Sequence, residues 1–425
     1  MIRIARAWKL GRRGLLSPNR ALQSKVALSD TPRLLVDVSA IIQHDAQTGI
    51  QRVVRAVWSE LKRRSGSDFI AVPVFATRTA GYRYAPMEFL GNKPEALDLG
   101  VVRAGVNDKF LGLDLAAHLI PRYRRQLESW RTDGATLHLV LYDLLPLLHP
   151  EWFSAATARN FRKWFEILRN NADHALCISD SVMRDLQQQL ERSGGDGHLL
   201  ISRMQLGADI AASLPTSGIT EELTRVLERM RFRPAVLMVG TIEPRKGYDV
   251  ALNAFEYLWR TGAGDAPDLV ILGKSGWKTD ALQDRIRRHP ELGRRLHWLQ
   301  GVSDEALCLF YRACRGLLVT SYGEGFGLPI LEAASHGCAI LARDIPVFRE
   351  QCIPNITFFH RDEPASLVTG LRDLLAVDRV TNGRAVELPT WRGCVGELLQ
   401  NMGIGSSGAK KLPALPARPR ISAAG

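Results

Sequence analysis

Short apolar runs alternate with longer amphipathic runs along most of this chain, and this alternation limits the folds that are open to it. The apolar runs have the length of strands and are predicted at residues 33–38, 135–141, 172–178, 235–239, 268–272, 296–299, 316–320 and 339–341. Helical periodicity separates several of them, most clearly at residues 49–61, 249–259, 304–314 and 329–336. Strands and helices that alternate at this spacing predict an α/β fold with parallel, doubly wound sheets.

The alternation breaks near the middle of the chain, after Leu206-Gly207, and the stretch from Pro215 to Gly218 has the composition of a linker. A chain of 425 residues is long enough for two or three domains. We therefore predict two Rossmann-like domains, over residues 31–215 and 216–403, that face each other across a cleft. Ligands of such sheets bind at the carboxyl ends of the strands, so the cleft is the predicted site.

The net charge of +12 lies mostly at the two ends of the chain. Residues 1–30 hold seven basic residues and one acidic residue, and they have the pattern of a basic amphipathic helix. This pattern fits two interpretations about equally well, a helix that lies on an anionic membrane surface and an amino-terminal segment without stable structure. An organelle transit peptide fits it less well. Residues 404–425 are rich in Gly, Ser, Ala and Pro, which predicts a disordered tail. Because the body is nearly neutral, no nucleic-acid partner is expected.

The cysteines and histidines do not have the spacing of metal ligands. None of the six cysteines forms a Cys-x-x-Cys pair, and the ten histidines show no clustered pattern. We therefore expect no metal site and a reducing, cytoplasmic compartment. No apolar run reaches the roughly 18 residues of a membrane-spanning helix, which argues against a transmembrane protein.

The strongest local pattern is the glycine-rich stretch from Ser321 to Glu332, which follows a predicted strand and opens a predicted helix. Its glycines let the backbone approach a ligand closely, and a helix start favours an anion. Glu324 lies in the loop and Glu332 in the helix. Two carboxylates so placed can accept hydrogen bonds from a sugar and a ribose that flank a diphosphate.

Three other interpretations of this stretch compete with a ligand site. Glu332 could be a solvated helix residue, and the glycines could form an ordinary strand-to-helix turn. The stretch fits the Gly-rich fingerprint of dinucleotide-binding proteins poorly, because position 328 is Leu where that fingerprint has its third Gly. It also lacks an obvious acidic residue for the ribose about 20 residues further along the chain.

A second pattern runs from Gly240 to Gly247, again directly after a predicted strand. It places Arg245 and Lys246 at the carboxyl edge of a sheet, where two cations would neutralise a diphosphate. The spacing is not that of a P-loop. Taken alone, such an Arg-Lys pair more often lies in a solvent-exposed turn than in a ligand site.

The first half offers two weaker candidates. Gly49 lies between a strand and a helix, where it permits close approach of a phosphate or an acceptor. A plain helix-start turn is about equally consistent with it. Tyr142 and Asp143 end the strand over residues 135–141, so their side chains could face the cleft, or Asp143 could be a turn residue before Pro146.

Several stretches together resemble the family 4 retaining glycosyltransferases, which have a GT-B fold. In the second half they are residues 240–247, 272–277, 324–332 and 343–350, and in the first half residues 37–39, 48–53, 141–146 and 177–180. The resemblance covers roughly residues 33–400. Within the family, the chain is most similar to bacterial enzymes that build surface polysaccharide, many of which are mannosyltransferases.

The resemblance implies a role for each candidate residue. Glu324 would hold hydroxyls of the donor sugar, and Glu332 would hold the nucleotide ribose. Lys246 and Arg245 would bind the donor diphosphate and act with Glu324 in catalysis. Phosphate contacts would come from the loop that starts at Gly240 and Thr241, from the amides of Phe326, Gly327 and Leu328, and from Gly49 across the cleft.

Two positions depart from the family pattern. Many relatives have Arg where this chain has Thr241, so Arg245 would have to supply that charge. Many have His-Asp where this chain has Tyr142-Asp143, although a tyrosine could still hydrogen-bond an acceptor sugar.

The implied function is retaining transfer of a hexose from a nucleotide diphosphate sugar, without a metal or other cofactor. The preferred donor is GDP-mannose, and the acceptor is a lipid-linked or growing surface polysaccharide at the cytoplasmic face of a bacterial membrane. The alternatives are a nucleotide-sugar epimerase of the same fold and a non-catalytic protein that binds nucleotide sugars.

Overall fold

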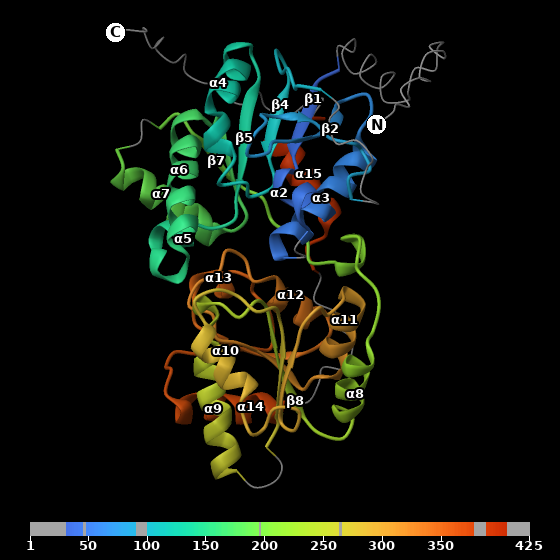
Figure 1. Cartoon of the computed structure of the whole chain (residues 1–425), viewed down its shortest axis with the longest axis vertical. Helices are drawn as coiled ribbons and strands as arrows, with labels where there is room; N and C mark the ends of the chain where they lie inside the picture. The colour runs from blue at the N-terminus through green and yellow to red at the C-terminus, as the bar shows by residue number, and fades with distance from the viewer. Residues whose placement is uncertain are drawn as a thin grey trace, which may run out of the picture.

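The computed structural model describes residues 31–45, 48–90, 100–194, 197–262, 266–377 and 388–405. These residues form two lobes stacked along the long axis of the molecule (Figure 1). The predicted basic segment 1–30 lies outside the described residues, and so does the predicted tail apart from Ile404 and Gly405. Within the described ranges, no helix is both long enough and apolar enough to cross a lipid bilayer.

The first lobe is built on a seven-stranded sheet with the order β3-β2-β1-β4-β5-β6-β7. All neighbours pair in parallel except β2 and β3, which are antiparallel. The strands are β1 Arg33–Asp37, β2 Ile70–Phe75, β3 Arg83–Tyr84, β4 Lys109–Gly112, β5 Thr136–Leu141, β6 His174–Cys177 and β7 Leu200–Arg203. Their helices are α2 Ser39–Gln43, α3 Gly49–Arg64, α4 Arg124–Thr132, α5 Leu145–Leu148, α6 Ala155–Asn171 and α7 Asp180–Arg192.

The second lobe is built on a six-stranded, fully parallel sheet with the order β10-β9-β8-β11-β12-β13. Its strands are β8 Ala235–Val239, β9 Asp268–Leu272, β10 Leu296–Leu299, β11 Gly316–Val319, β12 Ala339–Arg343 and β13 Ile356–Phe359. Its helices are α8 Glu221–Arg229, α9 Tyr248–Thr261, α10 Asp280–Arg287, α11 Asp304–Ala313, α12 Leu328–Ser335, α13 Pro346–Arg349 and α14 Pro364–Ala376. The predicted α/β class with two doubly wound parallel sheets is confirmed.

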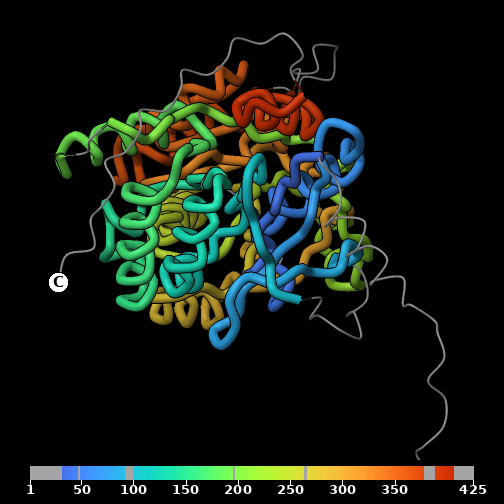
Figure 2. The backbone as a smooth tube through the Cα atoms, turned by 90° about the horizontal axis from the view of Figure 1, so that it is seen from above, coloured from blue at the N-terminus to red at the C-terminus, as the bar shows by residue number. Residues whose placement is uncertain are grey.

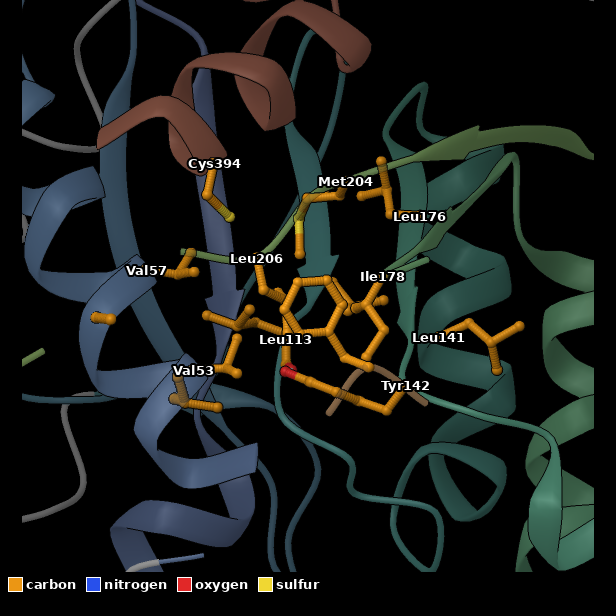
Figure 3. Close-up of a cluster of buried hydrophobic side chains, with 14 of the residues drawn as sticks. Val53, Val57, Leu113, Leu141, Tyr142, Leu176, Ile178, Met204, Leu206 and Cys394 are labelled. Carbon is orange, nitrogen blue, oxygen red and sulfur yellow. The ribbon is translucent and has the colours of Figure 1, made fainter. Parts of the chain in front are cut away.

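The last helix, α15 Trp391–Asn401, crosses back to the first lobe. It packs against α3, and Figure 2 shows the two segments side by side. Its apolar face, which includes Trp391, Cys394 and Leu398, is buried. Cys394 lies beside Val57 and Met204 in the first-lobe core (Figure 3). The predicted division at residues 216–403 placed this helix in the second domain, whereas its apolar face is covered by the first lobe. Ile404, predicted to start the tail, is also buried.

A pair of buried histidines lies on the neighbouring strands β5 and β6. The Nδ1 atoms of His138 and His174 are 3.3 Å apart. Thr136 Oγ1 lies 2.9 Å from His138 Nε2, and Ser202 Oγ lies 2.7 Å from His174 Nε2. Burial, with the nearby charge of Lys109, lowers the pKa of His174 to about 4. Burial, His174 and Lys109 also hold the pKa of His138 well below its usual value.

We expect this histidine pair to make the folded protein sensitive to acid. The unfolded state protonates His174 near pH 6.5 and the folded state only near pH 4, so stability is lost as the pH falls through that window. The loss approaches about 1.4 kcal/mol per pH unit for His174. Burial raises the pKa of Asp37 to about 7, and this shift acts in the opposite direction.

The measurement is therefore urea unfolding of the wild type and of His174→Asn over this pH range. The stability advantage of the wild type should shrink as the pH falls. A constant difference between the two proteins would contradict the assignment.

Candidate active site

A cavity of about 440 Å³ lies between the lobes, at the carboxyl ends of both sheets. Every residue that the sequence analysis assigned to the site lines this cavity. These residues are Gly49, Tyr142, Asp143, Gly240, Thr241, Arg245, Lys246, Glu324, Phe326, Gly327, Leu328 and Glu332. The two lobes therefore bring together stretches that are far apart in the sequence.

The centre of the cavity wall is a cluster of charged groups around Glu324. Arg245 donates from Nη1 to Glu324 Oε2 over 2.5 Å, and Lys246 donates from Nζ to the other carboxylate oxygen. Ser321 Oγ also donates to that second oxygen over 2.8 Å. Arg245 Nη2 lies 2.7 Å from a carboxylate oxygen of the buried Glu243. Glu324 thus holds both predicted phosphate-binding cations in place.

The cluster fixes the ionisation of its members. Burial alone would raise the pKa of Glu324, but the charges of Arg245 and Lys246 overcome it and hold this pKa at about 2. Burial raises the pKa of Asp143 and of Glu243, and the charge of Arg245 offsets part of each shift. At neutral pH Glu324 is therefore a carboxylate, which accepts hydrogen bonds and cannot serve as a proton donor.

Two loops carry this cluster and are bonded to each other. The loop after β8 closes in a short 3-10 turn over Pro244–Lys246, and Gly247 follows in the left-handed region with a φ of 62°. Thr320 Oγ1 donates to the backbone oxygen of Lys246 over 2.7 Å, and Tyr322 N donates to the backbone oxygen of Arg245 over 2.7 Å. Because the loops are joined at the backbone, the cations and the glycine-rich loop form one rigid wall.

The glycine-rich loop leads directly into α12, whose first turn lines the cavity. Gly327 has a φ of 93°, and a Cβ atom there would lie 2.9 Å from the ring of Phe348. Pro329 follows in the first turn, where its missing N–H costs nothing. The amides at the start of α12 are therefore available to an anion in the cavity.

Glu332, farther along α12, is buried and has partners from both lobes. Tyr311 donates from its hydroxyl to Glu332 Oε2 over 2.9 Å, and Arg52 in α3 donates to Oε1. The solvated-helix interpretation of Glu332 is therefore wrong.

Arg52 is the main residue of the site that sequence reasoning missed. Its guanidinium group lies between Glu332 and Asp304, so α3 of the first lobe is tied to α12 and α11 of the second. Asp304 in turn accepts from the N and Oγ1 of Thr216, each over 2.9 Å, in the segment that joins the lobes. In the sequence, the one feature that pointed to Arg52 was its position three residues after Gly49, which places both residues on the same face of the helix.

The first lobe contributes the start of α3 and the loop after β5. Thr48 caps α3, and Gly49 leaves open space in front of the first turn, since nothing lies within 4 Å of a Cβ built there. Tyr142 is buried, and its hydroxyl donates to the backbone oxygen of Leu113 over 2.8 Å (Figure 3). That hydroxyl is engaged within the lobe, so the structure does not direct it toward an acceptor sugar.

The lobes also meet at the rim of the cavity. Trp277 donates from Nε1 to the backbone oxygen of Trp152 over 2.8 Å, and Ser181 donates from N and Oγ to Glu350 Oε2 over 2.9 and 3.0 Å. Among the described residues, no group of three or more His, Cys, Asp or Glu side chains is placed to hold a metal ion.

Comparison with known proteins agrees with this geometry. Residues 221–382 match the protein family described as glycosyl transferases group 1. The serotype-specific mannosyltransferase WbdA of Escherichia coli is 37% identical over 396 residues, which are 90% of this chain and 46% of that protein. The match to the group 1 glycosyltransferases thus lies in the second half of the chain, and the similarity to WbdA extends over both halves. The chain spans about half the length of the WbdA proteins that it matches.

Further similarities are more local or concern the fold. The O-antigen chain mannosyltransferase B of Escherichia coli is 37% identical over 109 residues, 26% of this chain and 28% of that protein. HepE of Anabaena, solved with UDP and glucose, superposes with a TM-score of 0.62 at 15% identity, covering 88% of this chain and 99% of that one. A sucrose-phosphate synthase of Thermosynechococcus elongatus gives a TM-score of 0.61 at 16% identity, with 88% and 98% covered. The GT-B fold is confirmed.

Gly325 lies against the other lobe, and we expect an added methyl group there to break this contact. A Cβ atom at Gly325 would lie 2.0 Å from the backbone oxygen of Tyr142. Gly325→Ala should therefore hold the lobes apart and slow any reaction catalysed in the cavity by about 100-fold, because a site loses about that much rate when its reacting groups are misplaced by an ångström. The checks are kcat and the radius of gyration by small-angle X-ray scattering.

The matched control is Gly66→Ala, at an exposed turn where the nearest atom to a built Cβ is 3.9 Å away. It should leave both quantities unchanged. Full activity of Gly325→Ala would show that the closed contact is not needed.

Proposed function

We propose that this chain is a retaining glycosyltransferase that moves mannose from GDP-mannose to a lipid-linked or growing surface polysaccharide. The observation that carries the proposal is the cluster of Arg245, Lys246 and Glu324 in the interlobe cavity, facing the start of α12. The similarity to WbdA, described as a serotype-specific mannosyltransferase, supports mannose as the sugar.

The proposed donor fits the order of groups along the cavity. Glu324 takes hydroxyls of the sugar, the cations and the amides of α12 take the diphosphate, and Glu332 takes the ribose. A guanidinium group has five N–H donors, so Arg245 can contact Glu243, Glu324 and a phosphate together. In this proposal Gly49 and the start of α3 approach the diphosphate from the opposite lobe.

The chemistry requires stabilisation of negative charge on the leaving group. As the bond between the sugar carbon and the phosphate oxygen breaks, charge develops on the diphosphate, and the fixed cations and amides stabilise it. The acceptor oxygen bonds to the same face of the sugar carbon, and its proton passes to the leaving phosphate oxygen. The configuration is retained, and the step requires no protein base.

We also propose that the protein acts at the cytoplasmic face of a bacterial membrane, where residues 1–30 contact anionic lipid. The support is the basic, amphipathic pattern of that segment. Deleting residues 1–30 should lower binding to anionic liposomes, and the loss should shrink at high salt. Binding that does not depend on salt would contradict an electrostatic contact.

The donor is tested by thermal shift with GDP, UDP and ADP, followed by a transfer assay with radiolabelled GDP-mannose and an oligomannoside. GDP should give the largest shift, and label should enter the oligomannoside. A larger shift with UDP or ADP would exclude GDP-mannose as the donor. Conversion of the donor sugar without an acceptor would instead indicate an epimerase, and an unchanged donor would indicate a binding protein.

A further inference from the structure

Two aromatic side chains are exposed at the rim of the cavity. Trp277 is 40% exposed and Tyr322 is 37% exposed. Among the described Phe, Trp and Tyr residues, Phe232 is the one other with an exposed side chain, at 87%, and it lies just before the amino end of β8, far from the cavity. Exposed aromatic rings that gather next to a cavity usually mark a binding surface.

These rings continue across both lobes. The ring of Trp152 has its centroid 6.4 Å from that of Tyr322 and is stacked on His149 at 4.1 Å. The indole N–H of Trp277 is bonded to the backbone oxygen of Trp152 over 2.8 Å. We call His149, Trp152, Trp277 and Tyr322 the aromatic strip.

The aromatic strip starts at the part of the cavity assigned to the donor sugar. Trp277 itself lines the cavity, and Tyr322 is two residues from Glu324. A Cβ atom built at Gly323 would lie 3.0 Å from the ring of Trp152. The partners of Glu332, at the proposed ribose position, are Tyr311 and Arg52 and include no member of the strip.

Polar groups hold and border the rings. Tyr322 donates from its hydroxyl to Asp362 over 2.9 Å, and the guanidinium carbon of Arg343 lies 4.0 Å from its ring centroid. Lys278, beside Trp277, donates from Nζ to the backbone oxygen of Glu151 over 2.5 Å. Rings fixed in this way lose little conformational freedom when a ligand stacks on them.

From this arrangement we propose that the aromatic strip binds the acceptor glycan, and that sugar rings beyond the reacting end stack on its exposed faces. A pyranose presents C–H groups on its faces and hydroxyls at its edges, which match apolar rings bordered by charged and polar groups. Because the strip starts beside the donor sugar, a chain bound there leads its terminal hydroxyl into the cavity. This inference rests on the proposed function and assigns its acceptor subsite.

The test uses Trp277→Ala and Tyr322→Ala, with Phe232→Ala as the matched control for loss of an exposed ring. The acceptors are methyl α-mannoside, which is too short to reach along the strip, and a longer oligomannoside. Each strip variant should raise KM for the oligomannoside by about fivefold, with a smaller change for the monosaccharide. Phe232→Ala should leave both KM values unchanged. Trp277→Phe, which keeps a ring but loses the bond to Trp152, should retain most of the oligomannoside affinity.

Two further measurements separate this inference from the proposed function. GDP affinity should be unchanged in both strip variants, and a weaker GDP complex would assign the rings to the nucleoside and overturn the inference. Oligomannoside binding is also followed without a donor, by NMR of the tryptophan indole signals. If the wild type binds GDP but transfers nothing, the proposed function fails, and the NMR titration still tests the strip. Equal KM values of the strip variants and the wild type for the oligomannoside would overturn the inference.

Discussion

Replacing Lys246 with alanine should lower the transfer rate by roughly 100- to 1,000-fold, the usual effect of removing one group that stabilises charge in a transition state. The ammonium group of Lys246 lies at the cavity wall and is held by Glu324. Without it, the diphosphate loses a fixed cation both when it binds and when it leaves. GDP affinity should therefore fall together with kcat, as measured by calorimetry and by the radiolabel assay.

Glu324→Gln is the matched variant, and it should change GDP affinity in the opposite direction. The amide keeps the size of the side chain but removes the negative charge next to Arg245 and Lys246. Removing a charge that repels the diphosphate should strengthen GDP binding by roughly 1 kcal/mol, while transfer falls about 100-fold because the donor sugar loses its carboxylate partner. Weaker GDP binding in both variants would contradict this division of roles.

Arg52→Ala should destabilise the protein by about 3 kcal/mol, because it leaves two buried carboxylates without their cation. Glu332 and Asp304 are 2% and 7% exposed at the side chain, and the guanidinium group of Arg52 lies between them. The same change removes a direct link between the lobes. We therefore expect a lower midpoint of thermal unfolding and a smaller stabilisation by GDP, since Tyr311 alone then holds the side chain of Glu332 at the proposed ribose position.

Arg63→Ala is the matched control for this experiment. Arg63 lies on the same helix and pairs with Glu60 at 2.7 Å, but its side chain is 59% exposed. Exposed pairs contribute little to stability because solvent screens them, so this variant should unfold close to the wild-type temperature. If the two variants were equally stable, the link between the lobes would have no energetic role.

Much of the second lobe could be predicted because its strands are buried on both faces. The bounds of β8, β9 and β10 agree with the predicted runs, since strands in a parallel sheet appear as unbroken apolar stretches. The predicted start of α11 at Asp304 is also confirmed, and Ser303 caps the helix by accepting a hydrogen bond from Ala306 N over 3.1 Å.

The first lobe was harder to predict for a physical reason. The sequence analysis missed β2, which contains Pro73, and a proline counts against a strand. The sheet tolerates it because β2 lies next to the two-residue strand β3, which pairs with Val74 and Phe75 only. The strands β4 and β7 of this lobe have only four residues each, which is too short for a distinct apolar pattern.

The sequence by itself determined five strands of the second sheet, β8 to β12, and the glycine-rich loops at the cavity, because apolar runs and glycine-rich loops are local properties of the chain. Only the tertiary structure decided which of these residues contact each other. Arg52 meets Glu332 and Asp304 across 280 and 252 residues of sequence, and α15 returns to α3 from the far end of the chain. Such pairings depend on how the apolar faces of the whole chain are buried together, which no local pattern encodes.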